Sequence, residues 1–260
     1  MTTAPPALAR TRGLVASEWT KARSVRATYI TLAAAAAATI AVEIFTVATL
    51  KMSRLDRAHF DAVQTSLAGW LIVQLVFGVL GALSMTSEHG TGTIRTTFAA
   101  VPRRRRVLAA KAAVIGALSL AAGELIAFAA FFTGQLMLRD KHLDVTLGQA
   151  GVLRAVLAAG FYMFIMAMVG LGLGTVIRHT AGAVAAVGLV FIQPLIVNAM
   201  FPDPGSKAGN YVLWWAGQSI SSIRPHEGPY PPVGQSFAVC GGYAAAALIA
   251  ATVMITRRAA

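Results

Sequence analysis

Charged residues and cysteines are scarce in this sequence. Charged residues make up 12% of its 260 positions and hydrophobic residues 57%, whereas soluble domains carry roughly 25% charged residues. A soluble domain of this length could not bury so much apolar surface, and a disordered chain would contain few apolar residues. The single cysteine, Cys240, permits neither an internal disulfide nor a multi-cysteine metal site, and we expect it to be a small packing residue. The composition predicts an integral membrane protein.

The motifs of common catalytic sites are also missing. The chain contains no Gly-Lys dipeptide and therefore no P-loop for phosphate binding. It has no HExxH zinc motif and no GxSxG nucleophile motif. Its five histidines lie between the apolar segments or at their ends, which disfavours a haem site inside a helix bundle. We therefore predict no catalytic residue, no metal site and no cofactor bound by this chain.

Six apolar segments are long enough to cross the roughly 30 Å hydrocarbon core, which takes about 20 helical residues. They lie at residues 27–50, 67–85, 112–138, 155–177, 180–201 and 237–256. The third could begin nearer Val107, with Lys111 extending to the membrane surface. Only Arg178 and His179 separate the fourth from the fifth, which predicts a tight helical hairpin. The sequence thus predicts one all-α transmembrane domain with six spans over residues 1–260.

Positive charge is unevenly distributed among the connections. The chain has 22 Lys and Arg against 10 Asp and Glu, a formal net charge of +12. The N-terminal segment, the second and fourth connections and the C-terminal end together hold 14 basic residues but only two acids, Glu18 and Glu88. By the positive-inside rule, both termini are cytoplasmic. Nucleic-acid binding, the alternative meaning of a basic composition, would need a basic face on a soluble fold, so we expect no nucleic-acid partner.

The segment before the first span combines apolar and basic residues. Leu14, Val15 and Trp19 alternate with charged side chains, which predicts a helix lying in the inner membrane interface. The alternative is a solvated basic segment that only sets the topology. Trp19 favours the interfacial helix, because indole prefers that depth.

The connection between the second and third spans, residues 86–106, is rich in Thr and Gly and ends in four arginines. Ile94 and Phe98 are spaced i, i+4, which predicts a short helix over 93–100 with both side chains exposed on one face and ended by Pro102. Such a helix could fit the groove of a cytoplasmic partner. The alternative is a loop that only sets the topology, but the exposed apolar pair favours a docking element.

The outer connection between the fifth and sixth spans, residues 202–236, holds six of the ten prolines. Residues 210–223 within it are aromatic and amphipathic, which predicts a short external helix or a re-entrant element. We interpret Trp214 and Trp215 as anchors at the membrane interface.

Two acids lie within the spans. Ionisable groups in lipid are costly, so Glu43 and Glu124 are candidate functional residues. The functional interpretation is the wall of a hydrated pathway that contacts a polar or cationic substrate. The alternative is a carboxyl hydrogen-bonded to Ser or Thr on a neighbouring helix, and this alternative is favoured more clearly for Glu43, which is nearer the end of its span.

Small residues and one proline should shape the fourth and fifth spans. Gly170, Gly172 and Gly174 permit close contact between helices. Pro194 should kink the fifth span because it lacks a backbone N–H.

Several segments in a fixed order carry a family resemblance. They are residues 17–29 (SEWTKARSVRATY), 87–111 (SEHGTGTIRTTFAAVPRRRRVLAAK), 174–184 (GTVIRHTAGAV) and 216–225 (AGQSISSIRP), followed by a last span that ends in ITRRAA. Together with six spans, they resemble actinobacterial permease subunits of ABC transporters of the ABC-2 type. The sequence departs from that pattern at Trp214 and Trp215, where a more polar approach to the AGQ motif is expected.

The resemblance implies the permease of an exporter in the plasma membrane that works with a separate P-loop ATPase. ATP and Mg would bind to that partner, and two permease copies would assemble with two ATPases. The transported compound would be hydrophobic or amphipathic, such as an antibiotic or other drug, a peptide or a lipid, and it would cross between the permease copies within the surrounding membrane lipid.

The resemblance also assigns roles to the two inner segments. The N-terminal helix would be an elbow helix, and the loop after the second span would carry a coupling helix that docks on the ATPase. Its proposed contacts are Gly90, Gly92, Ile94, Arg95 and Phe98, with Glu88 anchoring the turn. The alternative is a non-transporting membrane sensor or scaffold that docks a cytoplasmic protein through the same loop; the missing motifs disfavour a third class, an intramembrane enzyme.

Overall fold

The computed structural model describes residues 7–24, 26–51, 60–100, 103–201, 207–224 and 230–257, and this part of the chain is helical without strands. The helices are α1 (Ala7–Ser24), α2 (Arg26–Thr49), α4 (Ala62–Ser66), α5 (Trp70–Gly90), α6 (Thr93–Ala100), α7 (Arg104–Arg139), α8 (Val152–Ile177), α9 (Thr180–Phe191), α10 (Gln193–Met200), the 3-10 helix η1 (Lys207–Tyr211), α11 (Leu213–Ile220) and α12 (Val233–Arg257). The prediction of an all-α fold is confirmed for these residues.

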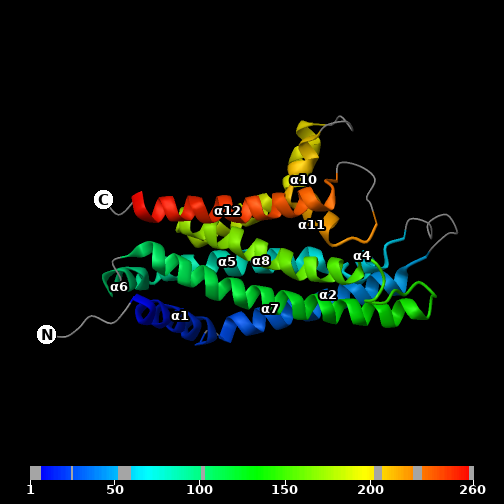
Figure 1. Cartoon of the computed structure of the whole chain (residues 1–260), viewed down its shortest axis with the longest axis horizontal. Helices are drawn as coiled ribbons and strands as arrows, with labels where there is room; N and C mark the ends of the chain where they lie inside the picture. The colour runs from blue at the N-terminus through cyan, green and yellow to red at the C-terminus, as the bar shows by residue number, and fades with distance from the viewer. Residues whose placement is uncertain are drawn as a thin grey trace.

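Within the described residues, five helices are long and apolar enough to cross a membrane: α2, α5, α7, α8 and α12. The bent pair α9 and α10 makes a sixth if the two count as one span. The pair replaces the continuous fifth span predicted over 180–201, because the chain breaks at Ile192 and bends by 54°. Pro194 lies in the first turn of α10, where it has no N–H to continue the hydrogen-bond pattern of α9. The predicted kink is therefore a break, and α10 projects sideways from the bundle (Figure 1).

The third span is longer than the predicted 112–138. Helix α7 has 36 residues and is therefore about 54 Å long. It begins at Arg104, because no Gly or Pro interrupts the arginine run after Pro102 and arginine is a good helix former. The helix thus extends toward α6 beyond the apolar segment (Figure 1).

Helix α8 is the buried centre of the bundle. It packs against α5, α7 and α12, and its small residues allow the close approach. A Cβ on Gly170 or Gly174 would overlap the α5 backbone at Gly78 or Ala82, and one on Gly172 would overlap Ala247 of α12. The close helix contacts predicted at these three glycines are confirmed.

A two-residue turn joins α8 to α9. Arg178 ends α8 with a φ of 62°, and His179 begins α9 as its N-cap. The His179 ring nitrogen Nδ1 accepts a hydrogen bond from the Gly182 N–H at 3.4 Å. The tight hairpin predicted from the short connection is confirmed.

The connections gather at two opposite ends of the bundle (Figure 1). Helix α6, the start of α1 and the end of α12 lie at one end, and α4 and α11 lie at the other. The end that carries α6 is called the α6 end below. Its position on the cytoplasmic side remains a prediction from charge.

At the opposite end, α11 is fixed to the bundle by hydrogen bonds at its C-terminus. Arg154 of α8 donates to the carbonyl oxygens of Ile220 at 2.7 Å and Ser222 at 2.6 Å. Asp61, the N-cap of α4, accepts hydrogen bonds from the Ser222 hydroxyl at 2.6 Å and the Ile223 N–H at 2.8 Å. These bonds hold a short helix within the predicted external connection, of which residues 202–206 and 225–229 lie outside the described residues.

The two tryptophans of α11 pack against the protein. Trp215 is 7% exposed, and its ring lies 6.2 Å from that of Tyr230. The Trp214 ring lies 5.3 Å from Phe191 and 6.2 Å from Trp70. The interpretation of Trp215 as an interface anchor is wrong, because sequence hydropathy does not distinguish an aromatic at a membrane surface from one packed under a loop. Trp214 is only half-buried, and its role as an anchor stays a prediction.

Candidate functional site: a charged cluster at the α6 end

Four charged side chains from α1, α5 and α7 meet at the α6 end of the bundle. The Lys111 Nζ atom lies 2.6 Å from Glu18 Oε2 and 2.8 Å from Glu88 Oε1. The Lys21 Nζ atom lies 2.7 Å from Glu18 Oε1 and 3.1 Å from the same Glu88 oxygen. Each lysine thus contacts both carboxylates, and the ring of alternating charge is closed. Glu18, Lys21, Glu88 and Lys111 are called the charged cluster below.

Most of the charged cluster is buried. The exposed fractions are 5% for Glu18, 8% for Glu88 and 4% for Lys111, whereas the Lys21 side chain is 40% exposed. Buried charges cost several kcal/mol each unless they are paired with good geometry. Because each carboxylate contacts both lysines, loss of the buried Lys111 would leave Glu18 and Glu88 with only the partly exposed Lys21.

Lys21 stays charged at neutral pH. Partial burial alone would lower its pKa, but the hydrogen bonds and negative charges of Glu18 and Glu88 outweigh that effect and raise the pKa above its ordinary value. This contribution to stability is present at and below neutral pH and is lost only as pH rises through the raised pKa of Lys21.

The charged cluster determines which face of α1 packs against the bundle. Glu18 and Lys21 are three residues apart and share that face. The Thr20 hydroxyl does not contact the bundle through this bond, since it donates to the Ala16 carbonyl oxygen within α1 at 2.9 Å. Val15 and Trp19 are 36% and 48% exposed. The polar side of the predicted amphipathic helix therefore meets α7, and two of its apolar residues remain available to lipid.

Glu88 also lies next to the turn that leads into α6. Gly92 has a φ of +72°, a conformation that glycine adopts without strain. The Thr93 hydroxyl donates to the Glu88 carbonyl oxygen at 3.4 Å. Glu88 thus connects the turn to α1 and α7 through its side chain and to α6 through its backbone.

Helix α6 occupies Thr93–Ala100, the range expected from the Ile94 and Phe98 spacing. Ile94 is only 7% exposed, in a hydrophobic cluster with Met85, Leu108 and Ile255. The prediction that Ile94 is exposed is therefore wrong, because the side chain anchors α6 to α5, α7 and α12.

The other predicted coupling residues have different surroundings. Gly90 is exposed at the end of α5, and a Cβ added to Gly90 or Gly92 would meet no heavy atom within 4 Å. The backbone of Arg95 and Phe98 lies in α6, and their side chains lie outside the described part of the structure.

Glu43 is buried where α2 meets α4 and α7. Its side chain is 0% exposed, and a Cβ on Gly134 would overlap both Glu43 Oε1 and the Ser66 hydroxyl. Ser66 accepts a hydrogen bond from the Gln135 amide at 2.9 Å. Among the described residues, neither carboxyl oxygen of Glu43 has a hydrogen-bond partner.

Glu124 lies elsewhere on α7 and packs against Gly160 of α8. It is ten residues from Gly134, the neighbour of Glu43, which corresponds to about 15 Å along the helix. The structure therefore does not bring the two acids within the spans together into one polar site.

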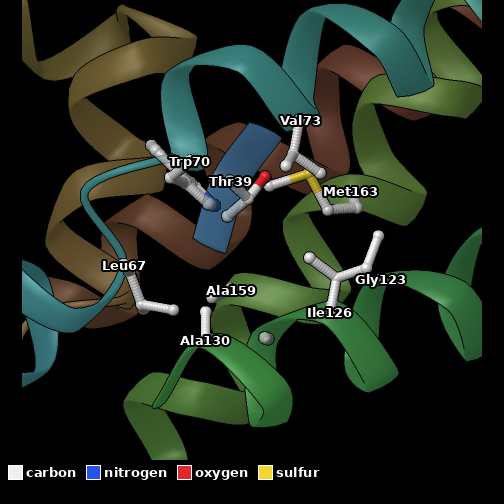
Figure 2. Close-up of a pocket in the computed structure, with 10 residues that line it drawn as sticks. Thr39, Leu67, Trp70, Val73, Gly123, Ile126, Ala130, Ala159 and Met163 are labelled. Carbon is white, nitrogen blue, oxygen red and sulfur yellow. The ribbon is translucent and has the colours of Figure 1, made fainter. Parts of the chain in front are cut away.

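The interior between α2, α5, α7 and α8 contains a small cavity (Figure 2). Its volume is about 10 Å³, and Thr39, Trp70 and Met163 lie around it. This is close to the minimum space for one water molecule. The cavity is too small for a transported drug, peptide or lipid.

Sequence reasoning assigned only Glu88 of the charged cluster to the site. Glu18 and Lys21 were assigned to a surface helix, and Lys111 was expected to extend to the membrane surface. The available signal was the scarcity of acids: Glu18 and Glu88 are the only two in the predicted inner segments, next to a lysine at the start of an apolar run. Among the described residues, no group of three or more His, Cys, Asp or Glu could hold a metal ion.

Comparison with known proteins identifies the family. The family model described as ABC-2 family transporter protein matches residues 14–195, which include the charged cluster, α6 and the four helices α2, α5, α7 and α8. Searches of curated proteins and of solved structures found no match. The family and the apolar helices together indicate a multi-pass protein of the plasma membrane. The chain belongs to the ABC-2 transporter family, whose members are permeases that partner with an ATP-binding cassette subunit.

Proposed function

We propose that this chain is the membrane-spanning subunit of an ATP-driven exporter. A separate ATPase subunit binds ATP and Mg and supplies the energy, and this chain binds no cofactor of its own. The exported compound is hydrophobic or amphipathic: an antibiotic or other drug, a peptide or a lipid. The observation that carries the proposal is the charged cluster, because it joins α1 and two spans directly beside α6.

Helix α6 is the proposed contact with the ATPase. Arg95 and Phe98 of α6 and the turn at Gly90 and Gly92 are the proposed docking element, whereas Ile94 holds the helix against the bundle. A displacement of α6 by the ATPase would be transmitted to α5 through the turn at Glu88. Because Glu88 shares Lys111 and Lys21 with Glu18, the same displacement would move α7 and α1 together.

The transport pathway is proposed to lie between two permease copies that assemble with two ATPases. The cavity around Thr39, Trp70 and Met163 offers no route through the centre of one copy, since its volume of about 10 Å³ has room for one water at most. Glu124, which is partly exposed, is the proposed pathway residue. Glu43 is proposed with it, although its full burial favours a structural role.

Purification of the chain from its native membrane in mild detergent tests this function. We expect a P-loop ATPase to copurify in stoichiometric amount, and the complex to hydrolyse ATP faster when its substrate is added. A permease oligomer that survives purification without any ATPase would contradict the proposal and favour the sensor or scaffold. Replacing Glu124 with Gln and finding unchanged transport would remove its pathway role.

A further inference from the structure

Helices α1, α2, α5 and α7 surround a cavity of about 290 Å³ at the α6 end of the bundle. Ligand pockets begin at about this size. Glu18, Lys21 and Lys111 line one end of the cavity, and two of these three side chains are at least 95% buried. The remaining walls come from three helices that cross the membrane. The cavity therefore combines buried charge with walls formed by membrane-spanning helices.

The lining changes from polar to apolar most clearly on α5, where it runs from Ser87 and Ser84 to Leu80 and Phe77. On α7 it runs from Lys111 through Ile115 to Leu118, with the hydroxyl side chain of Ser119 beside Leu118, and α2 contributes Thr28, Thr31 and Leu32. Lys111 and Leu118 are about 10 Å apart along α7. The charged end lies toward α6 and the apolar end toward the middle of the bundle. This matches the orientation of an amphiphile in the membrane leaflet on the α6 side.

The polar end carries no net charge but retains hydrogen-bond donors. Two lysines face two glutamates in the charged cluster. An ammonium group has three N–H donors, and each lysine uses two of them within the cluster, so each has one left. A ligand with a net charge would meet like charges as well as opposite ones. A zwitterionic headgroup can place its phosphate on the lysines and its ammonium beside Glu18.

We propose that this cavity binds a zwitterionic phospholipid from the leaflet on the α6 side. The phosphate accepts hydrogen bonds from Lys21 and Lys111, and the first part of an acyl chain packs against Leu80, Phe77 and Leu118. The cavity holds the headgroup and the start of the chain, while the rest of the lipid remains in the membrane. This site lies within one subunit, apart from the proposed pathway between copies, and it does not depend on the ATPase.

The test uses the full-length protein in nanodiscs made of equal parts phosphatidylcholine and phosphatidylglycerol. A trace of phosphatidylcholine carries a photoreactive diazirine near the start of one acyl chain, and labelled peptides are identified by mass spectrometry after illumination. We expect labels on α5 and α7 around Leu80 and Leu118. Leu118→Trp fills the cavity and should reduce this labelling by about tenfold, which corresponds to a tenfold loss of affinity.

Leu120→Trp is the matched control, because Leu120 is two residues away on α7 and 39% exposed. It should leave the labelling unchanged. Should Leu118→Trp not yield a monodisperse protein, Ser84→Phe narrows the same cavity from α5. Equal labelling of the wild type and a folded cavity-filled variant would overturn the proposal.

The headgroup is tested with a phosphatidylglycerol probe that carries the diazirine at the same position. We expect weaker labelling, because this lipid is anionic and lacks the ammonium group that Glu18 would contact. Labelling by the anionic probe that equals or exceeds that by the zwitterionic one would contradict the assigned ligand class. Neither outcome depends on ATP hydrolysis, so this test can fail without affecting the proposed exporter function.

Discussion

At the scale of single residues, Lys111 has the most constrained surroundings in the charged cluster. Its ammonium group contacts two carboxylates within 2.8 Å and is almost inaccessible to water. Lys21 contacts the same two carboxylates but is 40% exposed on its side chain. The two lysines thus have the same partners and opposite solvent access, which makes them a matched pair for experiment.

We predict that Lys111→Met destabilises the protein by about 3–5 kcal/mol, because it leaves Glu18 and Glu88 buried with one cation fewer. Lys21→Met should cost about 1 kcal/mol or less, since solvent screens a partly exposed pair. Thermal unfolding of the two variants in detergent measures the difference. If Lys111→Met and Lys21→Met lowered the unfolding free energy equally, the prediction would be contradicted, because burial would then not determine how much each lysine stabilises the protein.

Glu43 has the opposite character, since it is buried but has no hydrogen-bond partner among the described residues. An unpaired buried charge is far more costly than a neutral group of the same shape. Glu43→Gln should therefore change the unfolding free energy by less than about 1 kcal/mol. A loss of several kcal/mol would mean that the negative charge itself stabilises the fold.

The elements of the bundle depend on how closely α5 and α8 approach each other. Gly170 and Gly174 allow backbone contact with Gly78 and Ala82, and such contact stabilises helix pairs where the surrounding lipid is as apolar as the side chains. The short α9 differs, because a Cβ on Gly188 would meet no heavy atom within 4 Å. The close contact between α5 and α8 therefore requires glycine at position 170, whereas the packing around α9 does not require glycine at position 188.

We predict that Gly170→Ala destabilises the bundle by about 1–3 kcal/mol, the usual cost of overpacking. Gly188→Ala should have no destabilising effect, because alanine is the better helix former. Both variants change one hydrogen to one methyl group, and thermal unfolding compares them directly. Similar melting temperatures for the two variants would contradict the close α5–α8 contact.

Helix α6 carries an anchoring residue, Ile94, and the proposed docking residues Arg95 and Phe98. Ile94→Asp should lower stability and coupling together, because it places a charge among Met85, Leu108 and Ile255.

Phe98→Asp should leave membrane insertion intact and yet uncouple transport from ATP hydrolysis. Transport and ATPase rates of the reconstituted complex measure the coupling. Normal transport by Phe98→Asp would count against α6 as the coupling helix.

The sequence predicted several elements because their signals are local. Apolar runs indicate α5, α8 and α12 directly, and the spacing of Gly170 and Gly174 indicates a contact surface. The range of α6 follows from local signals as well, since Gly92 precedes it and Pro102 follows it. By contrast, the full break at Ile192 depends on packing around α11 as well as on Pro194, so the sequence predicted only a kink.

The charged cluster and the buried side of α6 could not be predicted in this way. Glu18 and Lys111 are 93 positions apart in the chain, and only the packing of α1 on α7 brings them together. Ile94 was expected to be exposed because a helical pattern shows which residues share a face but not what that face meets. Trp215 was assigned to the membrane surface for the same reason.

At the scale of the whole molecule, the bundle has two different ends. The α6 end carries the charged cluster, the cavity and the anchored helix α6, whereas the opposite end is closed by α11 with Arg154 and Asp61. This asymmetry fits a permease that receives force at one end and releases its substrate at the other. The central claim is that the ATPase binds at the α6 end.

Site-specific crosslinking in the native membrane tests that claim most directly. The only native cysteine, Cys240, is buried, so an added cysteine on an exposed residue is the main reactive thiol. Thr96→Cys places it on α6, and Thr146→Cys places one at another exposed position, in the connection between α7 and α8. With a thiol-to-amine crosslinker, we predict that Thr96→Cys links to a P-loop ATPase and Thr146→Cys does not. Crosslinking of the ATPase from Thr146 alone, or from neither position in an intact complex, would contradict the account.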